Sequence, residues 1–511
     1  MSEFSYDDVP YPSYAFPQTS PDRLATMATL FGMQPAPPNR CRVLEIGCGD
    51  GTNLLSHAFL LPESEFVGID LSSVQIADAK DSAKHLGLTN TRFEQINILD
   101  FDQDYFGKFD YIVTHGVFSW VPSEVRAKLL EIYIGALAEQ GVGYISYNAF
   151  PGCHLRRIVW DLMRFHTMDE PEPGKKIVMG RKIVRLLTDS LPEENIYKKV
   201  MEHELESVLK RDPENILHDD LSKMNQPFYF NEFAELIESY GLQYLCEADP
   251  LFLGDGTLSP GESQLMEIVK NDFKRREVYR DFMELARFRS SLVCGPDAQF
   301  DKNAAVSSIP KLAVASPVKP LKSHPMLADE TPESFEGSKG GAFELNHPLT
   351  KATLAFLRSV WPRSASFDEI LRGSRSLLGS DGPMGLRDIS RTQEFLYELF
   401  RNGFIRLHVH RFNFSASVSE RPEASAFARW QVERGSRSVA TMAGVNIDVE
   451  LEVVREMICL SDGSRSVQQL ADELYRRVAV PFSERDNFLK YSPKMIDDNL
   501  RKMAEWGLLV K

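Results

Sequence analysis

Short apolar runs alternate with amphipathic stretches between residues 41 and 147. The runs are typical of parallel strands that are buried on both faces. They span residues 41–47, 66–69, 109–114 and 142–147, with a weaker run at 91–96. Helical spacing of apolar residues lies between them, at 52–61, 72–86 and 123–139. This alternation predicts an α/β fold with a doubly wound, Rossmann-like sheet, which binds its ligand at the carboxyl ends of the strands.

The alternation then gives way to a charged helical stretch at residues 153–225, with a break expected near Pro171 and Pro173. One helix and two apolar strands follow, at 231–240, 242–246 and 288–294. If these two strands pair, they complete a seven-stranded sheet. The charged stretch is then a helical insertion into the same domain.

The rest of the chain changes character. Residues 296–345 are rich in Pro, Ser, Lys and Gly, which predicts a linker with one strand near 312–318. Two modules follow, and each ends in an amphipathic helix, a Gly turn (Gly403 or Gly507) and a short strand, as in α+β winged-helix units. The predicted boundaries are 1–40 for an N-terminal segment, 41–155 for the core, 156–225 for the insertion, 226–295 for the region that completes the sheet, 296–345 for the linker, and 346–415 and 440–511 for the modules.

The charge of the chain and its use of cysteine narrow the range of functions that the protein can have. The net charge is -15, and the first 165 residues hold 20 acidic against 12 basic side chains. Such a surface attracts cationic substrates and repels nucleic acid. The six cysteines form no CxxC pair, and no apolar run approaches the ~20 residues that span a bilayer. We therefore expect a cytoplasmic protein without a metal site, membrane insertion or nucleic-acid partner.

The first strand leads into a GxGxG loop, Gly47-Cys48-Gly49-Asp50-Gly51, and carries Glu45 at its end. Alternate glycines let the backbone bend tightly and approach a ligand. No third glycine stands at the dinucleotide position, so the spacing favours S-adenosylmethionine (AdoMet) over NAD. Asp70 ends the second strand, 19 residues beyond Gly51, where a carboxylate can accept both ribose hydroxyls. Asn97 follows the weak strand, where its amide could bind the adenine amino group.

Methyl transfer also needs a dry substrate pocket that aligns nucleophile and methyl group. Two strand ends, 114–120 and 146–154, supply aromatic groups that would favour a cation. Phe118, Trp120 and Phe150 are either pocket walls or core residues. His115 is a candidate for a base, a pocket wall or a hydrogen-bonded structural histidine. The Asn/Asp-Pro-Pro-aromatic motif of many amide and base methyltransferases is absent from both strand ends.

Beyond these single residues, the chain resembles a known family. The most specific segments are 115–122 (His-Gly-Val-Phe-Ser-Trp-Val-Pro) and 146–152 (Ser-Tyr-Asn-Ala-Phe-Pro-Gly), and the likeness extends to about residue 295. Further matching segments are 11–12, 20–26, 41–49, 67–72, 75–76, 229–230, 244–249 and 288–289. These residues resemble bacterial class I methyltransferases that carry a methyltransferase regulatory domain. That group includes rickettsial-type protein lysine methyltransferases that modify outer-membrane adhesins.

The resemblance implies a protein lysine N-methyltransferase that uses AdoMet as its cofactor. Its partner would be a lysine-bearing protein, such as a surface or outer-membrane protein. The N-terminal segment would cover the cofactor. The implied cofactor-binding residues are Tyr14, Gln18, Glu45, Gly47, Cys48, Gly49, Asp70, Leu71, Asn97, Ile98 and the backbone at His115. The implied substrate-side residues are His115, Phe118, Trp120, Tyr147, Phe150 and His154. Two positions depart from the family, because Phe118 stands where Tyr is frequent and Cys153 replaces a usual Trp.

Other functions remain open at this point. A small-molecule N- or O-methyltransferase is the alternative among enzymes. A DNA-binding regulator would use the winged-helix-like modules, but residues 440–511 hold 12 acidic against 10 basic groups, which disfavours a phosphate-binding face. A catalytically inactive AdoMet sensor is a third alternative. A homodimer is compatible with the sequence.

Overall fold

A computed structural model describes residues 9, 11–253, 258–337, 340–380, 385–477 and 485–510. Residues 1–8 and 10 of the expected N-terminal segment lie outside this range, as do 338–339 of the expected linker and 381–384, 478–484 and 511 of the modules. Among the described residues, no helix is both long enough and apolar enough to cross a membrane.

The centre of the fold is a seven-stranded sheet in the order β3-β2-β1-β4-β5-β7-β6. Strands β1 to β5 run parallel, and β7 pairs antiparallel with both β5 and β6. The strands are β1 Arg42–Ile46, β2 Glu65–Asp70, β3 Thr91–Gln95, β4 Phe109–Thr114, β5 Leu137–Asn148, β6 Gln243–Glu247 and β7 Phe288–Cys294. The predicted seven-stranded Rossmann-like sheet is therefore confirmed.

Helices cover both faces of this sheet, which explains why its strands are apolar on consecutive positions. Val43 faces one buried cluster, whereas Leu44 and Ile46 face the other. The helices on the first face are α1 Pro21–Leu30, α2 Thr52–Leu60 and α3 Ser73–His85. Those on the second face are α4 Gln103–Phe106, α5 Ser123–Ala136 and α10 Phe230–Ser239.

Local capping sets the beginnings of two helices beside the site. Ser20 accepts a hydrogen bond from the Arg23 amide at 3.2 Å, and Pro21 occupies the first turn of α1. Ser72 caps α3 in the same way, through the Gln75 amide. The helix expected over 123–139 ends at Ala136, because the chain then becomes extended and Leu137 pairs with Phe109.

A helical hairpin and its neighbours lie between β5 and β6, so they are inserted into the sheet domain. They are α6 Gly152–His166, α7 Pro173–Ser190, α8 Ile196–Lys210 and α9 Pro213–Asn215, and they share a small apolar core of their own. Two helices separate β6 from β7, namely α11 Pro260–Ile268 and α12 Phe273–Glu284.

The segment expected to be a linker is instead part of the packed structure. Val314, Val318 and Phe335 are fully buried in the cluster that also contains α1. It contributes α13 Ala305–Ser308, β8 Ala313–Ala315, β9 Lys319–Pro320, β10 Glu333–Glu336 and β11 Ala342–Leu345. The composition was misleading because these strands are too short to show an apolar period.

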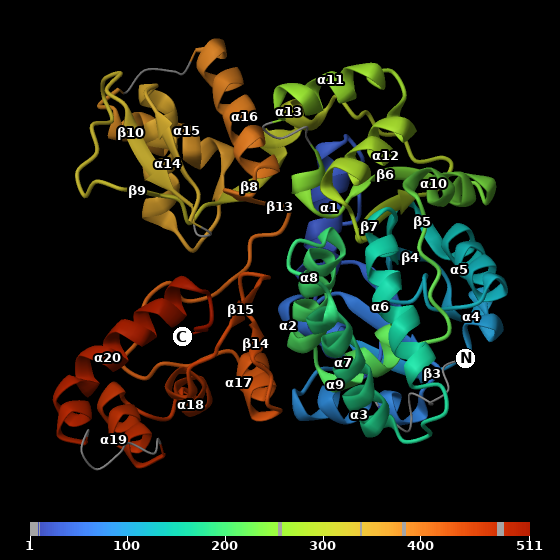
Figure 1. Ribbon diagram of the computed structural model, residues 1–511. Helices are drawn as coiled ribbons and strands as arrows, with labels where there is room; N and C mark the ends of the chain where they lie inside the picture. Colours follow the sequence, from blue (N-terminus) through green and yellow to red (C-terminus); the bar gives the residue numbers. More distant parts are fainter. Residues whose placement is uncertain are drawn as a thin grey trace.

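The first C-terminal module shares this core with the sheet domain (Figure 1). Its elements are α14 Pro348–Val360, β12 Ala365–Ser366, α15 Phe367–Leu377, α16 Leu386–Arg401 and β13 Arg406–His408, and β8 is the central strand of its β12-β8-β13 sheet. Asp22 of α1 accepts hydrogen bonds from the His410 amide and pairs with His408 Nδ1 at 2.8 Å.

The second C-terminal module has a separate apolar core and lies beside α2 and α3 (Figure 1). Its elements are α17 Ala426–Glu433, the hairpin β14 Ser438–Ala440 and β15 Asn446–Asp448, α18 Glu452–Leu460, α19 Val467–Arg477 and α20 Arg485–Glu505.

Candidate active site

The loop after β1 has a backbone that only glycine adopts without strain at three of its positions, Gly47, Gly49 and Gly51. Gly47 has a φ of 75° and Gly49 a φ of 55°. A Cβ on Gly47 would lie 2.5 Å from Cγ2 of Val117, and a Cβ on Gly49 would lie 2.8 Å from Oε1 of Gln75. Side chains at these positions would strain the backbone and meet neighbouring side chains, so the loop requires glycine there.

Glu45 lies at the end of β1, buried beneath this loop. Its Oε1 accepts a hydrogen bond from Asn53 Nδ2 at 2.8 Å, whereas its buried Oε2 has no hydrogen-bond partner among the described residues. Burial, with smaller contributions from the carboxylates of Asp50 and Asp70, raises the pKa of this carboxyl to about 8, although the Asn53 hydrogen bond opposes the rise. A positively charged ligand beside Glu45 would stabilise the ionised form of this carboxyl.

Asp70 ends β2 and faces the same loop. Its Oδ2 accepts from the Gly49 amide at 3.0 Å, and its Oδ1 accepts from the Ser72 amide at 2.9 Å. These bonds fix the orientation of the carboxylate. Leu71 next to it is 62% exposed, although it is apolar.

The end of β3 lies next to Asp70, because the Ile96 amide donates to the Asp70 carbonyl at 2.9 Å. Asn97 is exposed there, and its Oδ1 caps a short turn by accepting from the Leu99 amide at 3.1 Å. Ile98 is half-buried against the second core cluster. Cys48 is buried on the other side of the loop.

Residues 11–19, which we call the strap, cross over the glycine loop. The Phe16 amide donates to Asn53 Oδ1 at 2.7 Å, so the strap is tied to the residue that also holds Glu45. At its other end Tyr14 donates to Asp212 Oδ2 at 2.7 Å, on the insertion, which together with burial raises the pKa of Tyr14 to about 12. Gln18 lies near the Tyr144 side chain.

His115 follows β4 and packs against the strap. Its ring centroid lies 3.9 Å from that of Phe16 and 5.9 Å from that of Phe288. Its Nδ1 lies 3.0 Å from the Tyr144 hydroxyl, which itself donates to Ser290 Oγ at 2.9 Å. The hydroxyl therefore accepts from Nδ1–H, and Nε2 is left as an acceptor. Burial lowers the pKa of His115 to about 4, so the ring is neutral near pH 7.

A second aromatic group, which we call the rim, lies beside the end of β5. Phe150 stacks on His154 with centroids 4.1 Å apart, and Tyr229 lies 5.2 Å from Phe150. The Tyr229 hydroxyl is 3.0 Å from His154 Nε2, and Phe282 stacks on Tyr229 at 6.0 Å. His154 and Phe282 are exposed, so this group is open to a partner.

Two other predicted substrate residues are part of the core. Phe118 and Tyr147 are each 1% exposed and pack on Phe233, with centroid distances of 5.7 Å and 4.1 Å. Core packing, the alternative considered for Phe118, describes both rings. Trp120 is half-buried in the loop after β4, where its amide donates to the Val117 carbonyl at 2.8 Å.

Comparison with known proteins agrees with this geometry. A family model described as a methyltransferase domain matches residues 38–203, and one described as a predicted methyltransferase regulatory domain matches residues 212–295. The uncharacterized protein RP789 of Rickettsia prowazekii (strain Madrid E) is 36% identical over 383 residues, which cover 73% of this chain and 68% of that protein. The chain belongs to the class I AdoMet-dependent methyltransferases that carry a methyltransferase regulatory domain.

Two further relatives extend the comparison of this methyltransferase. The uncharacterized protein RP028 of the same organism is 37% identical over 235 residues, which cover 46% of this chain and 94% of that protein. The structure of PKMT2 from Rickettsia typhi in complex with AdoHcy matches 98% of this chain and 100% of that chain, with a TM-score of 0.86 and 26% identity. The likeness therefore includes the C-terminal modules.

The residues of this methyltransferase fit AdoMet. The glycine loop packs closely against Val117, Gln75 and Ser13, and the buried Oε2 of Glu45 has acceptor capacity for a cationic group. Asp70 presents a fixed carboxylate at the same edge of the sheet.

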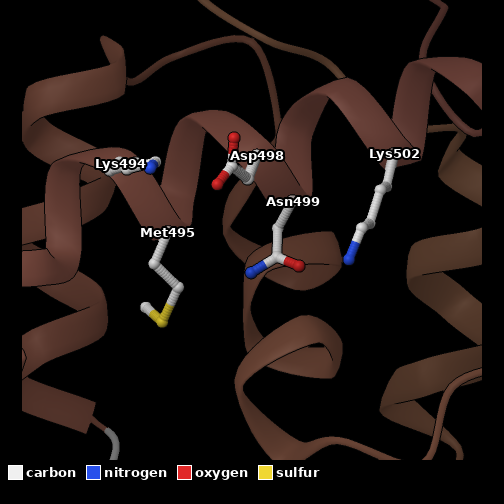
Figure 2. Close-up of a pocket in the computed structure, with 5 residues that line it drawn as sticks. All are labelled: Lys494, Met495, Asp498, Asn499 and Lys502. Atoms are coloured by element: carbon white, nitrogen blue, oxygen red, sulfur yellow. The ribbon is translucent and has the colours of Figure 1, made fainter.

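A depression of about 290 Å³ lies elsewhere, on α20 of the second C-terminal module. Figure 2 shows its lining side chains, which are Lys494, Met495, Asp498, Asn499 and Lys502. It is separate from the glycine loop, and its mixed charges give no reason to place the cofactor of the methyltransferase there.

Sequence reasoning missed three residues that shape the site, namely Asn53, Phe16 and Tyr144. Asn53 had a usable signal, since it is a polar residue in the first turn of the helix after the glycine loop. Tyr144 had none, because its hydroxyl meets His115 only through the pairing of β4 with β5.

Proposed function

We propose that this methyltransferase transfers methyl groups from AdoMet to lysine side chains of a protein substrate. The observation that carries the proposal is the full-length likeness to R. typhi PKMT2, a protein lysine methyltransferase. That likeness covers the regulatory region and both C-terminal modules. A match limited to the cofactor domain would support any methyl acceptor equally well.

The cofactor residues proposed here lie at the carboxyl ends of β1 to β4. Bound AdoMet supplies an electrophilic methyl group on a sulfonium. Glu45 would pair with positive charge, Gly47 and Gly49 would present backbone, and Asp70 would accept the ribose hydroxyls. The residues that would line the rest of the site are Tyr14, Gln18, Cys48, Leu71, Asn97, Ile98 and the backbone at His115.

The substrate side is proposed to lie between the two aromatic groups. Phe288 pairs with Asn148 in the sheet, and Phe150 follows Asn148 by two residues, so His115 with Phe288 and the rim flank one strand end. Phe118 and Tyr147 would pack beneath these rings in the core, and Trp120 would form the wall of the pocket at the loop after β4. Aromatic faces attract an ammonium at the entrance and exclude water further in.

A lysine amine must lose its proton before it can attack, and its ordinary pKa is about 10.4. Dry aromatic surroundings lower that pKa because they disfavour the ammonium. His115 has a pKa of about 4, which makes it a poor proton acceptor at neutral pH. We therefore propose that His115 positions the amine and that solvent takes the proton.

The test is transfer of radiolabel from AdoMet to a panel of bacterial surface proteins, followed by mass spectrometry of the labelled product. We expect methyl-lysine on one of them, and no label with an Asp70→Ala variant. Label found on small molecules alone, or on a protein residue other than lysine, would overturn the lysine assignment.

We also expect the affinity for AdoMet to depend on pH through Glu45. Glu45 is largely protonated below pH 8 in the free protein, and a cationic ligand favours its ionised form. Binding therefore releases a proton at pH 6–8, so affinity should rise by up to about tenfold per pH unit and level off above pH 8.

The control for this pH dependence is Glu45→Gln, which cannot ionise. Because the ligand amine titrates in the same range, the readout is the difference in binding free energy between wild type and the variant, measured by calorimetry. The difference should grow from pH 6 to 8. A constant difference would show that Glu45 does not change ionisation on binding.

A further inference from the structure

The strap is hydrogen-bonded by a residue that lies outside the cofactor-binding domain. Asn446, the first residue of β15, donates from Nδ2 to the Ala15 carbonyl at 2.6 Å. The next residue, Phe16, is the one tied to Asn53 and stacked on His115. The strap is therefore clamped between the second C-terminal module and α2, directly over the glycine loop.

The same module also contacts the glycine loop itself. Arg434, at the end of α17, donates to both carboxylate oxygens of Asp78 on α3, at 3.1 Å and 2.5 Å. Its guanidinium also lies 3.9 Å from Asp50, whose Oδ1 accepts from the Thr52 amide at the start of α2. One side chain of the module thus bridges the glycine loop and the helix that follows β2.

An apolar contact supports these polar ones. Phe427 of α17 is buried and packs on Phe59 of α2 with centroids 5.9 Å apart. The Arg434 guanidinium rests on the Trp430 ring at 5.3 Å, which fixes its direction. The module is therefore docked on α2 by a packed face, and its polar contacts have a defined geometry.

We infer that Asn446 and Arg434 are positioning residues for the AdoMet site, through which the second C-terminal module holds the strap and the glycine loop closed. The inference rests on the proposed cofactor site and not on the identity of the methyl acceptor. Exchange of AdoHcy for AdoMet requires Ala15 and Phe16 to move away from the loop. That movement breaks the Asn446 bond, so the module sets the rate of cofactor exchange.

The experiment measures AdoHcy dissociation from the full-length protein by stopped-flow displacement. Asn446→Ala removes one hydrogen bond, and we expect dissociation about two- to tenfold faster. Arg434→Asp breaks the bridge and adds repulsion, with an effect of similar size. The double variant Arg434→Asp/Asp78→Arg restores the pair with reversed charges and should return the rate toward wild type.

A control and a second readout separate positioning from general damage. Arg501→Ala changes an exposed ion pair on α20 of the same module and should leave the rate unchanged. In Asn446→Ala the KM for AdoMet should rise more than the rate of single-turnover methyl transfer at saturating AdoMet falls, because saturating cofactor repopulates the closed site. Variants that release AdoHcy at the wild-type rate, or a charge swap that restores nothing, would overturn the inference. Wild-type protein that binds no AdoHcy would instead refute the cofactor site itself.

Discussion

Replacing Arg289 with Met is expected to lower the free energy of unfolding by about 3–5 kcal/mol. The Arg289 side chain lies on β7, is fully buried, and pairs with Glu247 at 2.9 Å, Asp281 at 2.9 Å and Glu277 at 3.1 Å. The variant removes the cation and leaves these carboxylates buried without it. Arg280 pairs with Glu277, so Glu247 and Asp281 would lose the most.

The loss should depend on pH. Burial already raises the pKa of Asp281 to about 7, and the Arg289 guanidinium opposes that rise. Without the guanidinium the pKa of Asp281 in the folded protein increases further. The folded state then accommodates the Asp281 carboxyl mainly in its protonated form. Folded-state stability of the variant is therefore present at low pH and lost as pH rises, and the deficit relative to wild type should be larger at pH 8 than at pH 5.

Urea unfolding at both pH values measures this deficit. The matched control is Arg275→Met, on the same helix as Asp281, whose side chain is 75% exposed and pairs with Asp272. We expect it to change stability by less than about 0.5 kcal/mol. If Arg289→Met were as mild as this control, the cluster would not hold the regulatory region on the sheet.

The strands of the sheet could be predicted because burial on both faces leaves a local trace. Phe66 and Val67 face opposite clusters, yet both are apolar, so β2 is recognisable without any knowledge of its neighbours. In the expected linker, β8 corresponds to the strand predicted near 312–318, whereas β9, β10 and β11 leave no such trace. Val314 and Phe335 are buried by partners that are distant in sequence, and β8 is only three residues long.

The turns that carry the proposed cofactor residues could be placed from the sequence for a similar reason. Gly47, Gly49 and Asp70 lie in two strand–helix turns, where local geometry dictates the residue types. The strap clamp was not predictable, because Asn446 meets Ala15 across 431 residues of chain. The rim was half found, since Phe150 and His154 are close in sequence, whereas Tyr229 arrives from beyond the insertion.

Replacing Asp70 with Ala is expected to weaken AdoMet binding about 100-fold. A hydrogen bond to a charged group contributes about 1.5–3 kcal/mol, and the proposed role gives Asp70 two ribose hydroxyls to hold. Calorimetry measures the loss. Asp81→Ala, an exposed change on α3, is the matched control and should leave the affinity within twofold of wild type.

The loss alone would not identify the ribose contact, because Asp70 also holds the Gly49 and Ser72 amides. A cofactor analogue without ribose hydroxyls separates the two contributions in a double-mutant cycle. Wild type should bind the analogue far more weakly than AdoMet, whereas Asp70→Ala should bind both alike. If the variant still preferred the intact ribose by the wild-type factor, Asp70 would only shape the loop. The hydroxyls would then have to be held by another residue of the same strand end.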